Sequence, residues 1–330
     1  MMISPKFWHR PKPDWRAQAL RPLGSVYAWA TARRLAKGQP AHMGIPVVDV
    51  GNINAGGTGK TPTVMAVVDH LRGLYHQPHI VSRGYGGRLE GPVMVDPARH
   101  SASDVGDEPL LLAAFAEVWV AKDRAKAARA AQQAGATVVV LDDGFQSPAL
   151  VYDLSIVVVD AERGFGNGLC LPAGPLREPV AVGLARADLL LSIGDTAAQH
   201  RFDGYKLPTR LPHVRASLEP LQTGMEWSGA RVLAFAGIGH PEKFFATLRG
   251  LGANIVHAEA LGDHQDLTTT LMRRLETDAR TRDAQLVTTE KDAVRLPAAF
   301  RSRVITLPVR LKLPENNAMF EALNRLPRPA

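Results

Sequence analysis

Residues 51–62, with the sequence GNINAGGTGKTP, have the glycines, lysine and hydroxyl group of a phosphate-binding loop. The pattern G-x-x-x-x-G-K-[ST] ends here on Gly59, Lys60 and Thr61, and Asn54 stands where its first glycine is expected. Asparagine also tolerates left-handed backbone, so we expect the loop to keep its form. The predicted nucleotide-binding residues are Asn54, Ala55, Gly56, Gly57, Thr58, Gly59, Lys60 and Thr61.

The residues on either side favour a nucleotide site over a simple glycine-rich turn. A β-rich run precedes the loop, and a helical pattern with proline in its first turn follows it. Such a junction points backbone N–H groups and the helix dipole at anionic oxygen. Lys60 can then reach the β- and γ-phosphates of ATP, and the Thr61 hydroxyl can bind Mg²⁺.

A second motif supplies acidic metal ligands. The apolar run TVVVL is followed directly by Asp142 and Asp143. A P-loop site commonly uses an acid at the end of another buried strand to hold Mg²⁺. The sequence leaves open which of the two aspartates contacts the metal.

These motifs lie in a chain that alternates strand and helix patterns. The β-branched runs, at 46–50, 79–82, 137–142, 155–160 and 188–193, predict buried strands. Helical patterns occur at 61–73, 108–120 and 124–135. This alternation predicts an α/β fold, a P-loop NTPase-like and mostly parallel sheet with helices on both faces.

A second, smaller α/β domain is predicted from the patterns that follow residue 230. The predicted organisation is a basic aromatic segment at 1–37, a P-loop domain at 38–204, a linker or β-ribbon at 205–230, the second domain at 231–302, and a return strand with a C-terminal tail at 303–330. A length of 330 residues fits about two domains of ~150 residues each.

Charge is distributed unevenly. The chain has 39 basic and 32 acidic residues, and its first 37 residues hold eight of the basic ones but a single acid, which leaves 31 of each sign in the remainder. Because this remainder of the chain has no net charge, its composition does not indicate a nucleic-acid partner. The single cysteine, Cys170, excludes an internal disulfide and favours a reducing compartment.

The basic N-terminal segment also contains three tryptophans. From Leu23 to Lys37 it can form a helix with Leu23, Val26, Tyr27 and Ala30 on one face. Two interpretations remain open: a helix lying in an anionic membrane interface, or one that packs its apolar stripe on the protein's own core. No stretch approaches the ~20 apolar residues of a membrane span, and no signal-peptide core is evident, so we expect a cytoplasmic protein that at most rests on a membrane.

Eight motifs, taken in order, resemble the tetraacyldisaccharide 4'-kinase (lipid A 4'-kinase) family. They are GNINAGGTGKTP, SRGYGG (82–87), VGDEP (105–109), LDDGFQ (141–146), LPAGPLREP (171–179), FAGIGHPEKFF (235–245), GDHQDL (262–267) and TTEKDAVRL (288–296). The resemblance covers nearly the whole chain, and DDGFQ with AGPLREP discriminates better than any phosphate loop.

The resemblance implies a reaction and a location. Family members transfer the γ-phosphate of ATP to the 4'-hydroxyl of a tetraacylated glucosamine disaccharide 1-phosphate, with ATP and Mg²⁺ as the expected cofactors. They work at the cytoplasmic face of the inner membrane of Gram-negative bacteria. The expected partners are the lipid disaccharide and an anionic membrane surface, with no nucleic acid and no obligate protein partner.

The resemblance also implies roles for individual residues. Asp107 would be the catalytic base with Glu108 beside it, although alone it is more typical of a helix N-cap. His264, which alone is more typical of a solvated loop, would pair with that base. Lys60 and Arg177 would act on phosphate, and Glu178 would assist the metal. The other candidates are Gln146, Arg124, for which a surface arginine at a helix start is the alternative, and Tyr85, for which a simple turn is the alternative.

Three positions depart from the family pattern, and individual residues also bear on three other classes of protein. Ser147 and Gln265 stand where histidine is common, and Asn54 where Thr or Ser is common. A membrane-associated P-loop ATPase switch would carry a lysine where Ala55 stands. A GTPase would need an N-K-x-D motif that TEKD does not supply, and the uncharged body disfavours a nucleic-acid-binding protein.

Overall fold

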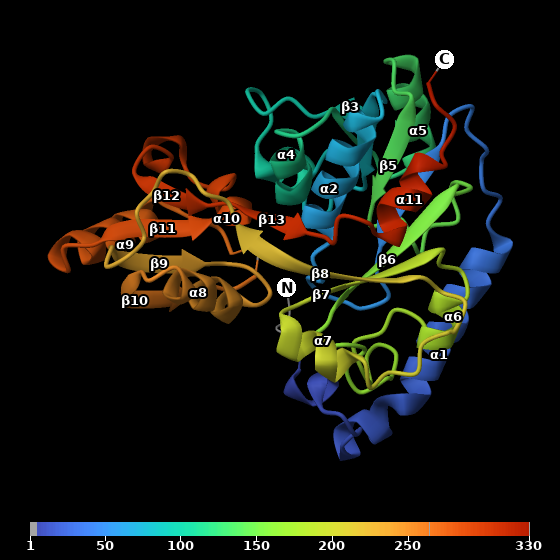
Figure 1. Ribbon diagram of the computed structural model, residues 1–330, viewed down its shortest axis with the longest axis horizontal. Helices are drawn as coiled ribbons and strands as arrows, with labels where there is room; N and C mark the ends of the chain where they lie inside the picture. Colours follow the sequence, from blue (N-terminus) through green and yellow to red (C-terminus); the bar gives the residue numbers. More distant parts are fainter. Residues whose placement is uncertain (1–4, 264, 330) are drawn as a thin grey trace. The chain divides into compact units, whose positions relative to one another are not determined.

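The computed structural model describes residues 5–263 and 265–329, which divide into two compact units. One unit comprises residues 5–218 with 311–329, and we call it the P-loop unit; the other, residues 219–310, is the inserted unit. Figure 1 labels their helices and strands. Each unit is described by itself.

The main sheet has nine strands in the order β13-β8-β7-β6-β1-β5-β2-β4-β3. The first strands along the chain are β1 (Val47–Gly51), β2 (Pro78–Ser82), β3 (Val93–Met94), β4 (Val118–Val120) and β5 (Val138–Asp142). They are followed by β6 (Leu154–Asp160), β7 (Leu189–Ile193), β8 (His213–Pro220) and, after the inserted unit, β13 (Val309–Lys312). The pairings from β8 through to β4 are all parallel, whereas β3 is antiparallel to β4.

Helices cover this sheet because its central strands consist mostly of apolar residues. Every residue of β1, β2, β5, β6 and β7 is buried, as expected for a parallel sheet covered on both faces. The helices and 3-10 turns of the P-loop unit are η1 (Lys6–His9), α1 (Trp15–Lys37), α2 (Lys60–Gly73), α3 (Ala102–Val105), α4 (Asp107–Leu112), α5 (Arg124–Gln133), α6 (Val180–Leu184), α7 (Thr196–Phe202) and α11 (Ala318–Asn324). The predicted mostly parallel α/β fold is therefore confirmed.

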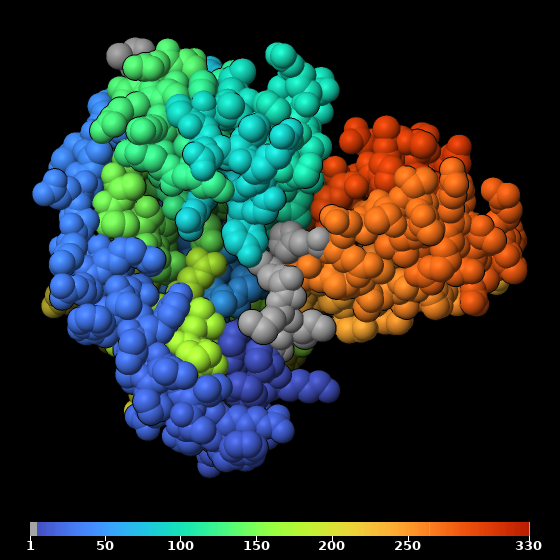
Figure 2. All heavy atoms as spheres, turned by 180° about the vertical axis from the view of Figure 1, so that it is seen from behind, coloured from blue at the N-terminus to red at the C-terminus, as the bar shows by residue number. Residues whose placement is uncertain are grey.

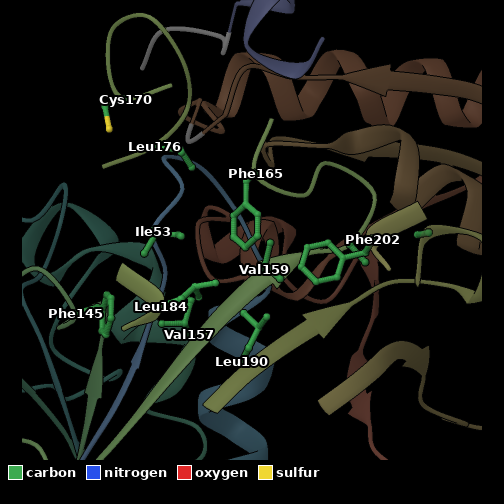
Figure 3. Close-up of a cluster of buried hydrophobic side chains, with 12 residues drawn as sticks. Ile53, Phe145, Val157, Val159, Phe165, Cys170, Leu176, Leu184, Leu190 and Phe202 are labelled. Carbon is green, nitrogen blue, oxygen red and sulfur yellow. The ribbon is translucent and has the colours of Figure 1, made fainter. Parts of the chain in front are cut away.

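Below the phosphate loop lies a core of aromatic and branched side chains. Figure 3 shows Phe145, Phe165 and Phe202 with Ile53 and Leu184 in this cluster, which joins β6 and β7 to the loops around them. A second cluster packs the alanines of α5 against β1 and β5. These two clusters fix the strand ends at which the chemical motifs lie.

The structure divides one predicted helix into a helix and a strand. The segment 108–120 was expected to be helical, but α4 ends at Leu112 and residues 118–120 form β4. The Val-Trp-Val sequence has strong β-propensity and pairs in parallel with β2. Burial on the sheet thus outweighs the helical pattern of the preceding alanines and leucines.

Helix α1 is longer than the sequence predicted and its apolar stripe faces outward. It begins at Trp15, with Asp14 as N-cap, and contains Pro22 in its interior. Its buried residues are the small ones, Ala17, Gly24 and Thr31. A Cβ at Gly24 would lie 2.8 Å from the Cys170 carbonyl oxygen, so a small residue is needed for this contact. The expectation that the stripe might pack on the protein's own core is wrong.

The inserted unit is a second parallel sheet with its own core. Its strands are β9 (Arg231–Ala236), β10 (Asn254–Ala260), β11 (Gln285–Thr289) and β12 (Val304–Leu307), in the order β10-β9-β11-β12. Its helices are α8 (Pro241–Gly250), α9 (Thr269–Thr281), α10 (Glu290–Ala293) and the 3-10 turn η2 (Ala298–Phe300). Two apolar clusters, one on each face of β9, hold these elements together.

No helix within residues 5–263 and 265–329 is both long enough and apolar enough to cross a membrane.

Candidate active site

The phosphate loop joins the end of β1 to the start of α2. Gly59, the N-cap of α2, is left-handed with φ 93°, and Gly56 has φ 110°, which are conformations that side chains rarely tolerate. A Cβ at Gly56 or Gly57 would meet no atom within 4 Å. The loop therefore leaves open space over the helix N-terminus, where phosphate oxygens can approach the backbone.

Asn54 supports the loop in a way that the sequence did not predict. Its backbone is not left-handed, so the tolerance of asparagine for that conformation is not used. Instead its buried Nδ2 donates to the Gly164 carbonyl at 3.0 Å. Asn52 helps from inside the loop, because its Nδ2 donates to Thr58 Oγ1 at 3.0 Å.

The segment of the AGPLREP motif pairs with the start of the loop. The Ala55 N–H donates to the Pro175 carbonyl at 2.6 Å, and the Arg177 N–H donates to the Ile53 carbonyl at 2.7 Å. Asn54 and Leu176 form an antiparallel bridge between these two bonds. Two motifs more than a hundred residues apart are thus fixed together by their backbones, and this carries Arg177 to the phosphate loop.

Asp143 is the point where three predicted residues meet. Arg177 Nη1 donates to both of its carboxylate oxygens, at 2.8 and 3.0 Å, and Lys60 Nζ lies 3.7 Å from Oδ1. Burial opposes a charge on Asp143, but Lys60 and Arg177 outweigh it and hold the pKa of this carboxyl well below its usual range. Asp143 is therefore an anion that fixes the lysine of the phosphate loop.

Arg124 fixes the backbone of the same turn. This residue begins α5, and its Nη2 donates to the Asp143 carbonyl at 2.7 Å. Asp143 has φ 59°, an unusual conformation for a residue with a side chain, so the turn benefits from a bond that holds it. Arg124 is accordingly part of the cluster, and the alternative of an uninvolved surface arginine is wrong.

Asp142 has a different environment from its neighbour. It is buried, its Oδ2 accepts from Ser82 Oγ at 3.2 Å, and its Oδ1 has no hydrogen-bond partner. Burial, followed by the charges of Glu108 and Asp143, raises the pKa of Asp142 to about 7. A buried carboxylate oxygen without a hydrogen-bond partner, next to a second carboxylate in the sequence, fits the hard oxygen donors that Mg²⁺ prefers.

Glu178, predicted to assist the metal, is engaged by protein groups. Arg186 Nη2 donates to both of its oxygens, at 2.8 and 2.7 Å, and Gln146 Nε2 donates to Oε1 at 2.9 Å. Gln146 in turn accepts from Arg177 Nη1 at 3.1 Å. Gln146 therefore lies between two predicted site residues, Arg177 and Glu178, and the contacts of Glu178 favour a supporting role over direct metal binding.

The predicted base lies at the N-terminus of α4. Asp107 is buried and is the first residue of the helix, whereas the N-cap is Gly106, so the expected alternative of an N-capping aspartate is wrong. The loop 84–87 packs closely against this segment. A Cβ at Gly106 would lie 2.6 Å from the carbonyl oxygen of Tyr85, and a Cβ at Gly87 would lie 2.6 Å from the carbonyl oxygen of Asp104. Glu108 is close enough to Asp142 to influence its charge. Tyr85 itself has an exposed side chain.

His264 lies outside the described residues, so its predicted pairing with Asp107 stays a prediction. The residues beside it form a closed turn, in which the Gly262 N–H donates to Gln265 Oε1 at 2.9 Å and the Gln265 N–H donates to the Gly262 carbonyl at 2.9 Å. Gln265, which stands where the family commonly has a second histidine, is thus used locally to close this turn.

Four contributors were not predicted from the sequence. Asn52, Ser82 and Arg186 act through the bonds given above, and Asp49 is fully buried in β1 beneath the Asp142–Asp143 turn. Burial, then the charge of Asp143, raises the pKa of Asp49 well above its usual value. An acid inside the apolar run VVDVG was a signal that could have identified Asp49. Arg186 follows a short helix in a segment without any motif, so nothing marked it.

A parallel sheet, a glycine loop that caps a helix, a lysine at that cap and paired aspartates on a neighbouring strand define a P-loop protein of the phosphoryl-transfer class. The profile of the family described as tetraacyldisaccharide-1-P 4'-kinase matches residues 16–327. The chain therefore belongs to the tetraacyldisaccharide 4'-kinase family.

Individual relatives agree with this assignment. The chain is 62% identical to the tetraacyldisaccharide 4'-kinase of Dinoroseobacter shibae, over 98% of both chains. It is 55% identical to the protein of the same name from Jannaschia sp., over 98% of this chain and 99% of that one. Among solved structures it resembles LpxK of Aquifex aeolicus in complex with ATP, with a TM-score of 0.75, 26% identity, and coverage of 94% of this chain and 98% of that chain.

Proposed function

We propose that this chain transfers the γ-phosphate of ATP to the 4'-hydroxyl of a tetraacylated glucosamine disaccharide 1-phosphate. The observation that supports this most strongly is the convergence of Lys60, Arg177 and the Asp142–Asp143 turn at one end of the sheet. The two cations at a phosphate loop are suited to aligning a triphosphate and offsetting its charge, and the two acids are suited to holding Mg²⁺. The identity of the acceptor is inferred from the names of the family and of its relatives.

The residues have distinct tasks in this proposal. The backbone N–H groups of 56–61 cradle the phosphates, and Lys60 and Arg177 lie against their oxygens. Asp107 accepts the proton of the 4'-hydroxyl while the hydroxyl oxygen forms a bond to the γ-phosphorus. The bond between the γ-phosphorus and the bridging oxygen breaks, and ADP leaves with that oxygen. His264 assists Asp107. Thr61, Asp142 and Asp143 would hold Mg²⁺, which when bound neutralises charge on the phosphate oxygens.

The test is a transfer assay with ATP labelled in its γ-phosphate and the lipid disaccharide in mixed micelles. Asp107→Asn preserves the shape of the side chain but cannot accept the proton, so we expect turnover to fall by about 10²–10⁴-fold. The dissociation constant of ATP, measured by calorimetry, should change by less than about threefold. An equal loss of ATP affinity would contradict the role of base. ATP hydrolysis by the wild type without labelled lipid would favour the switch ATPase instead.

We further propose that α1 lies in the interface of an anionic membrane, on the cytoplasmic face of the inner membrane. Its exposed side chains include Trp15, Trp29, Leu23 and Val26, with exposed fractions of 74, 61, 57 and 62%. Figure 2 shows this N-terminal segment, in blue, on the surface of the molecule. Basic side chains of the same helix can attract anionic lipid while the tryptophans enter the interface.

The same helix runs past the catalytic cluster. Burial alone would lower the pKa of Arg177, but Asp143 raises it, and Tyr27 of α1 and Glu108 contribute in the same direction. Tyr27 is therefore near Arg177 while Val26 and Trp29 beside it are exposed. A substrate whose acyl chains remain in the bilayer could thus present its sugar to the site.

The membrane test uses substitutions, because deletion of 1–37 would also uncover the surface that Gly24 and its neighbours cover. Trp15→Ser with Trp29→Ser should weaken binding to vesicles containing anionic phospholipid by about tenfold or more, without a change in ATP affinity. Tyr75→Asn, which removes an 87% exposed aromatic elsewhere in this unit, is the matched control. Unchanged vesicle binding by the double variant would rule out α1 as the membrane contact.

A further inference from the structure

Arg186 lies between α6 and β7, outside every motif, yet it contacts two of them. Its Nη2 donates to both oxygens of Glu178 in the LREP segment, and its Nη1 donates to the Phe145 carbonyl at 3.2 Å in DDGFQ. Its guanidinium also lies over the Phe145 ring, 4.3 Å from the centroid. Phe145 is a buried member of the core cluster in Figure 3, so the arginine has a rigid support on one side.

The partner of Arg186 is an anion that needs a counter-charge. The Glu178 side chain is 3% exposed, whereas that of Arg186 is 35% exposed. A carboxylate removed from water is costly unless it is paired and hydrogen-bonded. Arg186 supplies the pair, and Gln146 supplies the remaining hydrogen bond to Glu178.

This pairing fixes the orientation of the Gln146 amide. Its Nε2 donates to Glu178 and to the Asn52 carbonyl at 2.7 Å, so its Oε1 must face the other way. There it accepts from Arg177 Nη1, the same nitrogen that donates to both oxygens of Asp143. A continuous set of hydrogen bonds therefore runs from Arg186 through Glu178, Gln146 and Arg177 to Asp143, which lies beside Lys60.

We propose that Arg186 is a positioning residue for phosphoryl transfer. By neutralising Glu178 it keeps that carboxylate from drawing Arg177 away from Asp143, and it leaves Lys60 and Arg177 available to phosphate. Because the assay concerns the reaction proposed above, this inference rests on the proposed function. It also assigns Glu178 a role distinct from metal binding: its charge is compensated by Arg186.

The assignment is tested by removing the charge of each partner singly and then of both. Arg186→Met keeps much of the side-chain volume over Phe145 but leaves Glu178 unpaired. We expect kcat to fall by about 10–100-fold while the KM for ATP changes by less than about threefold. Glu178→Gln needs no counter-charge and can still accept from Gln146, so its kcat should stay within about fivefold of wild type.

The decisive variant combines Arg186→Met with Glu178→Gln. If Arg186 acts by neutralising Glu178, the double variant recovers to the level of Glu178→Gln alone, a strong non-additivity. Arg215→Met is the matched control, since Arg215 also pairs with an acid, Asp203, but lies outside these contacts. It should match wild type in kcat and KM.

A readout independent of turnover separates this inference from the proposed function. In arginine-labelled protein, the Arg177 guanidinium N–H signals, assigned with Arg177→Lys, should be protected from exchange in wild type. They should broaden in Arg186→Met and return in the double variant. If no lipid is phosphorylated by wild type but this pattern holds, the proposed function fails and the positioning role stands.

Three results would overturn the inference. Additive losses in the double variant would mean that the two residues act independently. A lower melting temperature for Arg186→Met with unchanged kcat and Arg177 signals would mean that Arg186 only stabilises the core. Loss of activity in Glu178→Gln together with a raised Mg²⁺ requirement would make Glu178 a direct metal ligand.

Discussion

Each unit has an aspartate beside an arginine at the end of a parallel strand, but the two clusters are completed differently. In the inserted unit, Asp292 is fully buried, accepts from the Gly237 N–H and Thr289 Oγ1, and pairs with Arg295. Arg295 also donates to the carbonyls of Gly237 and Gln265, at 3.0 and 2.8 Å. All these partners are protein groups, so this cluster braces loops.

In the P-loop unit the corresponding cluster is left incomplete. Asp142 has an oxygen without a hydrogen-bond partner, and the Asp143 side chain is 30% exposed, beside open space at Gly56 and Gly57. Buried charge therefore does not by itself mark a functional site. The difference lies in the carboxylates: both oxygens of Asp292 accept hydrogen bonds from protein groups, whereas Asp142 Oδ1 does not and is open to a ligand.

The largest effect should come from the incomplete cluster. Lys60→Met removes the cation next to Asp143, so we expect kcat/KM for ATP to fall by about 10²–10³-fold, because the phosphate charge loses a fixed partner. The free energy of unfolding without nucleotide should change little. Steady-state kinetics and urea unfolding check the two parts of this prediction. A large loss of stability with only a small change in kcat/KM would show that Lys60 serves the fold rather than the reaction.

The opposite pattern is expected for the complete cluster. Asp292→Asn leaves the buried Arg295 guanidinium without its counter-charge and should destabilise the inserted unit by about 3 kcal/mol. Fluorescence of the buried Trp227 during urea unfolding reports on this unit. ATP affinity of the folded variant should equal that of wild type. Unchanged unfolding would show that Asp292 is not the brace described above.

A smaller, pH-dependent effect distinguishes Asp142. Its folded pKa of about 7 is raised above the unfolded value, so ionisation opposes folding. Stability of the nucleotide-free protein with EDTA should therefore fall as pH rises from about 4 to about 7. Asp142→Asn removes this loss and should stabilise the protein by about 1–3 kcal/mol more at pH 8 than at pH 5. An equal effect at both values would contradict the raised pKa.

Sequence predicted the fold well where the patterns were strong. The apolar runs that became β1, β2, β5, β6 and β7 needed no information beyond their own composition. Prediction failed at β4, because its three residues continue a helical pattern and only pairing with β2 makes them a strand. The outward stripe of α1 was not decided either, since amphipathicity does not tell which medium covers the apolar face.

The site was predictable only in part. Lys60, Asp142 and Asp143 carry their chemistry in residue type and spacing, whereas Asp107, Arg177 and Gln146 were assigned through the family resemblance. Arg186 was not predicted as a site residue, because a single arginine outside a motif is normally a surface residue. The role proposed for it rests on its contacts with Glu178, which is close in the sequence, and with Phe145 of a separate motif, and no local pattern encodes this combination.

The chain leaves the P-loop unit through β8 and returns through β13, and these two strands are neighbours in one sheet. The inserted unit therefore begins and ends at neighbouring strands of the main sheet, so its two points of attachment are adjacent. The residues proposed to bind the triphosphate and Mg²⁺, together with the proposed base Asp107, therefore all lie in the part of the chain outside this insertion.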